Sequence, residues 1–162
     1  MTRRRPTEIE FVAFDDPQLL AAADGAAATG TGWINVEPVI EDEHQPFRPG
    51  PFAFLAGPTH EIPTATWVPG RHVPGAATKP TTIGLQHAGG PRVARKLRDL
   101  GMPVPEGWRV TQDHPRRGLV VSVPADCDRR TVLSWLLRAT EALCAVPATG
   151  RWRASVHDGV GR

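Results

Sequence analysis

Apolar and polar residues alternate or form short apolar runs at several places along the 162-residue chain, which is typical of β-strands. The runs predict strands at Ile9–Phe14, Gly32–Val36, Pro51–Ala56, Thr81–Leu85, Gly107–Val110, Leu119–Val123 and Trp152–His157. In three other segments apolar residues recur every three or four positions, the spacing of an amphipathic helix. These segments are Pro17–Ala28, Pro91–Leu100 and a longer one after Asp128. The mixture predicts an α+β protein, with an antiparallel sheet that carries its helices on one face.

The helix boundaries carry their own signals. Asp16 and Asp128 stand where an N-cap residue accepts backbone hydrogen bonds, and Gly30 stands where a helix can end. The buried face of the second helix is expected to comprise Val93, Leu97 and Leu100. That of the third, and longest, is expected to comprise Val132, Leu133, Leu136, Ala139 and Leu143, with Ser134 outside.

The predicted elements repeat in the same order. A strand and a helix lead to a Gly-Trp strand start, at Trp33 and again at Trp108, and then to a turn with His, Pro, Arg and Gly. This recurrence predicts an internal duplication of a strand-helix-strand-strand unit. From Thr81 to His157 the expected order is strand, helix, strand, strand, helix, strand, which is ferredoxin-like.

Four regions follow from this pattern. Residues 1–7 are expected to be a disordered basic N-terminus, and residues 8–56 the first unit. Residues 57–80 contain five prolines and are expected to form a loop or linker. Residues 81–158 are expected to form the ferredoxin-like unit. A chain of this length can bury one core, so one compact domain is expected overall.

Cysteine usage and hydropathy bear on location. Cys127 and Cys144 have neither metal-binding nor redox spacing, so both are expected to be reduced. No apolar stretch reaches the length of a signal sequence or a membrane span. These features favour a cytoplasmic protein without a membrane partner.

Charge is divided unevenly along the chain. Up to Thr78 there are five Arg against ten acidic residues, a net charge of −5, and from Lys79 onward fourteen basic against seven acidic residues, a net charge of +7. Either the two halves neutralise each other, or the basic half meets a polyanion such as nucleic acid. Mutual neutralisation is the favoured interpretation.

Glycines and arginines mark a candidate anion site. Gly89 and Gly90 precede the second helix, where backbone N–H groups and the arginines at its start favour phosphate or carboxylate. The candidate ligand-binding residues are Gly89, Gly90, Arg92, Arg95, Arg116 and Arg117. The loop lacks the Lys-Ser/Thr of a phosphate loop and the third glycine of a dinucleotide fingerprint, so no cofactor is expected and a plain tight turn is the favoured alternative.

Histidines are the candidates for acid–base chemistry. His44 and His114 occupy the same turn in the two predicted repeats, and His87 precedes the glycine loop. If the repeats are related by a pseudo-twofold axis, His44 and His114 could converge. No Cys/His cluster and no pair of histidines at helical spacing is present, so no metal site is expected.

Two further sequence features bear on partners. Trp67 lies in the proline-rich segment and is either a contact for a protein partner or a plug for the core. The strand at 119–123 carries Leu119 and Val121 where bases would need aromatic side chains, which disfavours RNA binding by stacking on the sheet.

The sequence therefore favours a noncatalytic cytoplasmic binding protein. Its basic C-terminal half would contact an anionic ligand, nucleic acid or a protein partner, and a homodimer is possible. The alternative is an enzyme acting on a phosphorylated or carboxylated small molecule in a cleft between the halves, with His44, His87 or His114 as acid or base.

Overall fold

Two aspartates begin the longer helices in the computed structural model, which describes residues 5–44, 62–71, 74–75 and 77–159. The carboxylate of Asp16 accepts hydrogen bonds from two N–H groups in the first turn of α1 (Pro17–Thr29). That of Asp128 accepts one in the first turn of α3 (Arg129–Ala142). Gly30 ends α1 in the left-handed conformation, with φ at 61°. The predicted caps are therefore confirmed.

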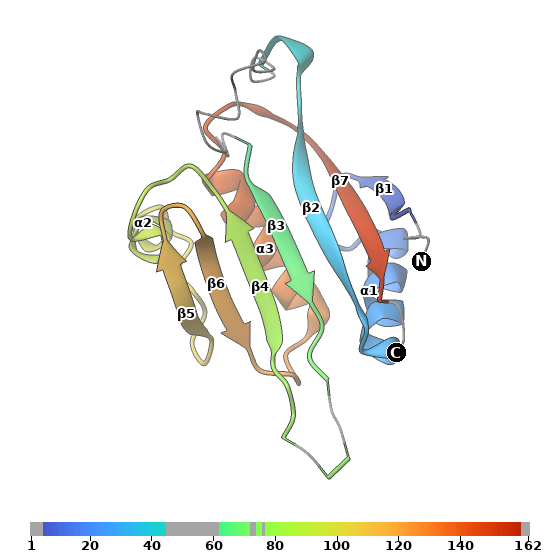
Figure 1. Cartoon of the computed structure of the whole chain (residues 1–162). Helices are drawn as coiled ribbons and strands as arrows, with labels where there is room; N and C mark the ends of the chain where they lie inside the picture. Colours follow the sequence, from blue (N-terminus) through green and yellow to red (C-terminus); the bar gives the residue numbers. More distant parts are fainter. Residues whose placement is uncertain (1–4, 45–61, 72–73, 76, 160–162) are drawn as a thin grey trace.

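The strands of the described residues form one seven-stranded sheet, in which every neighbouring pair is antiparallel. They are β1 (Thr7–Phe11), β2 (Gly32–Ile40), β3 (Thr64–Val68), β4 (Thr81–Gln86), β5 (Arg109–His114), β6 (Gly118–Val123) and β7 (Ala148–Asp158). The order across the sheet is β1-β7-β2-β3-β4-β6-β5. Helices α1 and α3 cover one face, and α2 (Val93–Asp99) lies near β5 at the edge (Figure 1). The α+β class is confirmed.

Two expectations about the strands differ from the structure, and a third falls outside the described residues. The segment 57–80 is not all loop, because β3 within it pairs with both β2 and β4 near the centre of the sheet. Asp113 and His114, expected in a turn, are the last residues of β5. The expected strand Pro51–Ala56 and residues 1–4 lie outside the described residues. Because β3 is short and lies between prolines, its sequence shows little periodicity. Its pairing with β2 and β4 stabilises it.

The strand order departs from a ferredoxin-like sheet. The element order from β4 to β7 along the chain is strand, helix, strand, strand, helix, strand. However, β2 and β3 lie between β7 and β4, so β7 pairs with the N-terminal strands β1 and β2. A single sheet is thus shared by both halves of the chain.

The internal duplication is not confirmed. Trp33 lies on the face of the sheet without helices, where it stacks on His157 of β7. Trp108 instead lies edge-on to Trp135 of α3, on the helical side. The two Gly-Trp strand starts therefore direct their indoles to opposite layers, and the pairing of His44 with His114 loses its basis.

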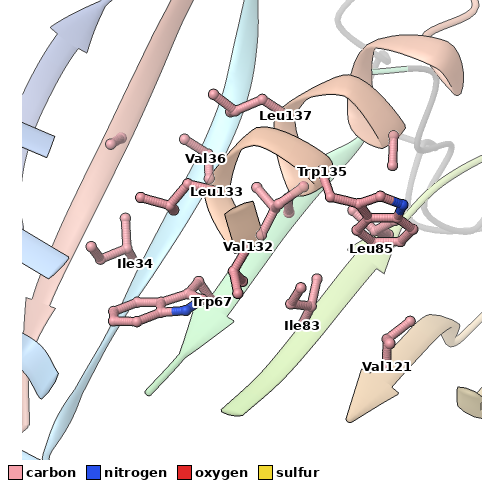
Figure 2. Close-up of a cluster of buried hydrophobic side chains, with 14 of the residues drawn as sticks. Ile34, Val36, Trp67, Ile83, Leu85, Val121, Val132, Leu133, Trp135 and Leu137 are labelled. Atoms are coloured by element: carbon pink, nitrogen blue, oxygen red, sulfur yellow. The ribbon is translucent and has the colours of Figure 1, made fainter. Parts of the chain in front are cut away.

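The core lies between the sheet and the helices. Every residue expected on the buried face of α3 is at most 7% exposed. Figure 2 shows Val132 and Leu133 of α3 packed near Trp67 of β3 and Ile34 of β2. In α2, Val93 and Leu97 are buried as predicted. Leu100 is 54% exposed, since the helix ends at Asp99, one residue earlier than expected, and Leu100 is its C-cap residue.

No helix among the described residues has the length and apolarity needed to cross a membrane.

Candidate functional site

The first turn of α2 is held by a carboxylate from the sheet. One oxygen of Asp113 in β5 accepts a hydrogen bond from the N–H of Val93, and the other accepts one from the N–H of Ala94, both at 3.0 Å. Arg92, which precedes the helix, supplies no side-chain cap and adopts φ of 59°. Asp113 therefore takes the place that an anionic ligand would occupy at this helix terminus.

The glycine loop is also satisfied from within the chain. The N–H of Gly89 donates to Nδ1 of His87 at 3.1 Å, and His87 itself is 2% exposed. Gly90 follows with φ of 76°, which a tight turn into α2 requires. Because Gly89, Val93 and Ala94 all donate to partners in the protein, their amides are not available to an added anion. The tight-turn interpretation is the better description of this loop.

Basic side chains of α2 and of the β5–β6 turn occupy the same corner of the molecule. The contact of Asp113 with the start of α2 brings these two elements together at the edge of the sheet (Figure 1). The basic corner, as we call it, comprises six exposed residues, Arg92, Arg95, Lys96, Arg98, Arg116 and Arg117. Within the described part of the chain, none of the six forms an ion pair with a carboxylate. Asp99 and the engaged Asp113 are the acidic residues of α2 and β5.

Other arginines of the basic half are neutralised by acids of the N-terminal half. Arg153 of β7 lies within ion-pair distance of Glu8, Glu10 and Glu37 on the two flanking strands. Arg151 pairs with Glu10 at 2.5 Å, and Arg129 of α3 pairs with Asp24 of α1 at 2.6 Å. These five contacts follow from the position of β7 and α3 against β1, β2 and α1. The uneven charge along the chain is therefore used in part for contacts between its halves.

Two of the candidate catalytic histidines, His44 and His114, lie far apart. His114 lies at the end of β5, and its Nδ1 accepts hydrogen bonds from the N–H groups of Arg116 and Arg117 at 3.1 and 3.2 Å. His44 follows β2 in a single 3-10 turn, η1 (Asp42–His44), four strands away across the sheet. Four spacings of about 4.8 Å separate these strands by roughly 19 Å.

Each histidine has a local environment of its own. Nδ1 of His44 lies 3.7 Å from a carboxylate oxygen of Glu43, its sequence neighbour. His87 is buried beneath the glycine loop, as described above. Among the residues that the structure describes, no three His, Cys, Asp or Glu side chains are grouped in a way that could hold a metal ion. The structure therefore gives no support to a convergence of His44 with His114.

Trp67 is part of the core and does not contact the surface. Its side chain is 1% exposed, and it lies in β3 on the face that the helices cover (Figure 2). The prediction that Trp67 contacts a partner is therefore wrong in this structure, and its alternative as a core residue holds. A protein partner or a homodimer stays a prediction without an assigned contact.

The open face of the sheet carries a cluster that sequence reasoning missed. Trp33 is 40% exposed and stacks on His157, with ring centroids 4.7 Å apart and 9° between the planes. Nδ2 of Asn35 lies 3.3 Å from Nε2 of His157, and Oδ1 of Asn35 accepts a hydrogen bond from the hydroxyl of Thr66. The alternation in β2 already placed Trp33 and Asn35 on one face. Only the pairing of β2 with β7 and β3 brings their partners there.

Leu119 and Val121 do not face this surface, since both are fully buried beneath the helices.

Comparison of the chain with protein-family models, with curated proteins and with solved structures finds no match. Function is therefore inferred from the geometry described above.

Proposed function

We propose that this protein is a noncatalytic, cytoplasmic binding protein that holds a polyanion, nucleic acid in the first instance, at the basic corner. The observation that carries the proposal is the double hydrogen bond of Asp113 to α2. It holds the cations of the helix and those of the β5–β6 turn at one edge of the sheet. No carboxylate of the described residues forms an ion pair with these cations. A chain of phosphates binds to neighbouring cations of this kind.

The exposure and the charge of its side chains also favour the basic corner as the binding surface. The six side chains of the basic corner are exposed, whereas the arginines of β7 are already paired with glutamates. Contacts to a polyanion would come from side chains, because the amides at the start of α2 are engaged. Side-chain contacts to phosphates give affinity without base readout, so little sequence preference is expected. The free thiols of Cys127 and Cys144 agree with a reducing compartment.

The proposal can be tested by fluorescence anisotropy with labelled single- and double-stranded DNA and RNA at several salt concentrations. The wild-type protein should bind, and the logarithm of its binding constant should fall linearly with that of the salt concentration. The double variants Arg92→Gln/Arg95→Gln and Arg116→Gln/Arg117→Gln should each bind more weakly to every sequence tested. Each should also flatten the salt dependence, by about 0.7–0.9 for every phosphate that the variant no longer neutralises.

The matched control is Arg130→Gln/Arg138→Gln, which removes the same charge from the outer face of α3. If this control weakens binding as much as the corner variants do, affinity follows net charge and not the basic corner. If the wild-type protein shows no salt-sensitive binding even at low ionic strength, the proposal is wrong.

A further inference from the structure

A groove lies on the outer face of α3, and none of its lining residues belongs to the basic corner. It has a volume of about 340 Å³ and is bounded by α3, by the loop between β1 and α1, and by the segment that follows α2. Phe14, Met102 and Trp135 contribute apolar surface to it. Arg130, Ser134 and Arg138 line it at successive turns of the helix.

The apolar floor of the groove is held in place. Nε1 of Trp135 donates a hydrogen bond to the carbonyl oxygen of Pro103 at 2.9 Å, which ties the indole to the segment beside the groove. Trp108 packs edge-on against the same indole, with ring centroids 5.4 Å apart. Trp135 is 7% exposed and Met102 is 9% exposed. A floor fixed in this way needs little ordering when a ligand binds.

The charges along the groove are basic. Arg130 and Arg138 are eight residues apart, about 12 Å along the helix axis, with Ser134 midway between them. Neither arginine forms an ion pair within the described residues, although the neighbouring Arg129 does. The nearby carboxylate of Asp128 is engaged by the N–H and the hydroxyl of Thr131.

We propose that this groove binds a small organic carboxylate with an apolar body. The body would lie against Phe14, Met102 and Trp135, and the carboxylate would accept hydrogen bonds from the guanidinium of Arg138 or Arg130. A volume of about 340 Å³ is at the lower end for ligand sites, which suits a compact aromatic or short aliphatic acid. The complementarity of charge selects an acid over a neutral molecule with the same body.

This site is independent of the proposed polyanion function. The groove lies on α3, and none of its residues belongs to the basic corner. Loss of nucleic-acid binding would therefore leave the proposal for the groove unchanged, and the reverse also holds.

Isothermal titration calorimetry with 2-naphthoate and with 2-naphthalenemethanol provides the test. The two probes share one apolar body and differ in charge. The wild-type protein should bind the acid at least about tenfold more tightly than the alcohol. Arg138→Gln/Arg130→Gln should remove this preference and leave the affinity for the alcohol unchanged. Arg95→Gln, a single charge change at the basic corner, should have no effect on either probe.

A second variant tests the position of the apolar body. Ser134 lies in the middle of the groove and is not part of the core, so Ser134→Leu should fill the groove without unfolding the protein. It should abolish binding of both probes, while circular dichroism and the melting temperature stay near those of the wild type. Equal binding of acid and alcohol, an unchanged preference in the arginine variant, or full binding by Ser134→Leu would each overturn the proposal. Absence of acid binding at millimolar concentration would also overturn it.

Discussion

The carboxylate of Asp113 at the end of β5 caps α2 at Val93, with 3.0 Å between the carboxylate oxygen and the backbone nitrogen. The residue that caps this helix stands twenty positions after Val93 in the chain, and so follows the helix that it caps. The position of α2 relative to the sheet therefore depends on a contact between two different elements. The arrangement of cations at the basic corner depends on the same contact.

Replacing Asp113 by alanine should destabilise the protein and weaken polyanion binding. Two backbone N–H groups would lose a charged acceptor, which should cost about 1.5–3 kcal/mol of unfolding free energy. Urea denaturation measures this cost. Asp99→Ala is the matched control, since it removes the same charge from an exposed position on α2 and should change stability by no more than about 0.5 kcal/mol. Equal costs for the two variants would contradict the capping role of Asp113.

Gly118 should tolerate a side chain less well than Gly107. Both adopt a positive φ, 82° and 81°, so alanine at either position should cost about 1–2 kcal/mol of conformational strain. At Gly118 a Cβ atom would also collide with the carbonyl oxygen of Leu85, whereas at Gly107 a Cβ atom would meet nothing within 4 Å beyond the neighbouring residues in the chain. Gly118→Ala should therefore cost about 2–5 kcal/mol in total, by chemical denaturation. Similar costs at both positions would show that the strand pairing adjusts to the extra atom.

The two faces of α3 should respond differently to truncation. Leu136 is fully buried, so Leu136→Ala should lower the unfolding free energy by about 2–5 kcal/mol. Ser134 lies on the outer side of the same helix, and Ser134→Ala should be nearly neutral. Urea denaturation at neutral pH compares the two variants. A large cost for Ser134→Ala would mean that its hydroxyl has a structural role.

Asp128 should contribute stability that is lost in acid. Hydrogen bonds from the backbone and side chain of Thr131 hold the pKa of this carboxyl below its usual value of 3.8. Because the folded-state pKa is lowered, the contribution is present above pH 3.8 and is lost as the pH falls through the folded-state value. Asp128→Asn should therefore be less stable than the wild type at pH 7, and the difference should shrink at low pH. Urea midpoints at several pH values test this, and a difference independent of pH would contradict it.

The helices were largely determined by local sequence. Asp16 and Asp128 cap α1 and α3 as predicted, and Gly30 ends α1 as predicted. Every residue predicted for the apolar face of α3 is buried, and Trp135, Leu137 and Thr140 are buried in addition. Helical hydrogen bonds join residues four positions apart, so the spacing of side chains along a short segment already identifies the helix and its buried face.

The sheet was decided by tertiary structure. Nothing local places β7 between β1 and β2, or β3 between β2 and β4, because strand pairing joins residues at any distance along the chain. Arg151 and Glu10, an ion pair in the structure, are 141 positions apart. The burial of Trp67, the separation of His44 from His114 and the stacking of Trp33 on His157 all follow from this strand order.

The basic corner depends on both local sequence and tertiary structure. The sequence alone identified Arg92 and Arg95 at the start of a helix, and Arg116 and Arg117 in a turn. It could not show that Asp113 fills the helix terminus, because that contact crosses from β5 to α2. The charge of each side chain follows from its residue type. Whether a partner neutralises that charge depends on which elements the folded chain brings together.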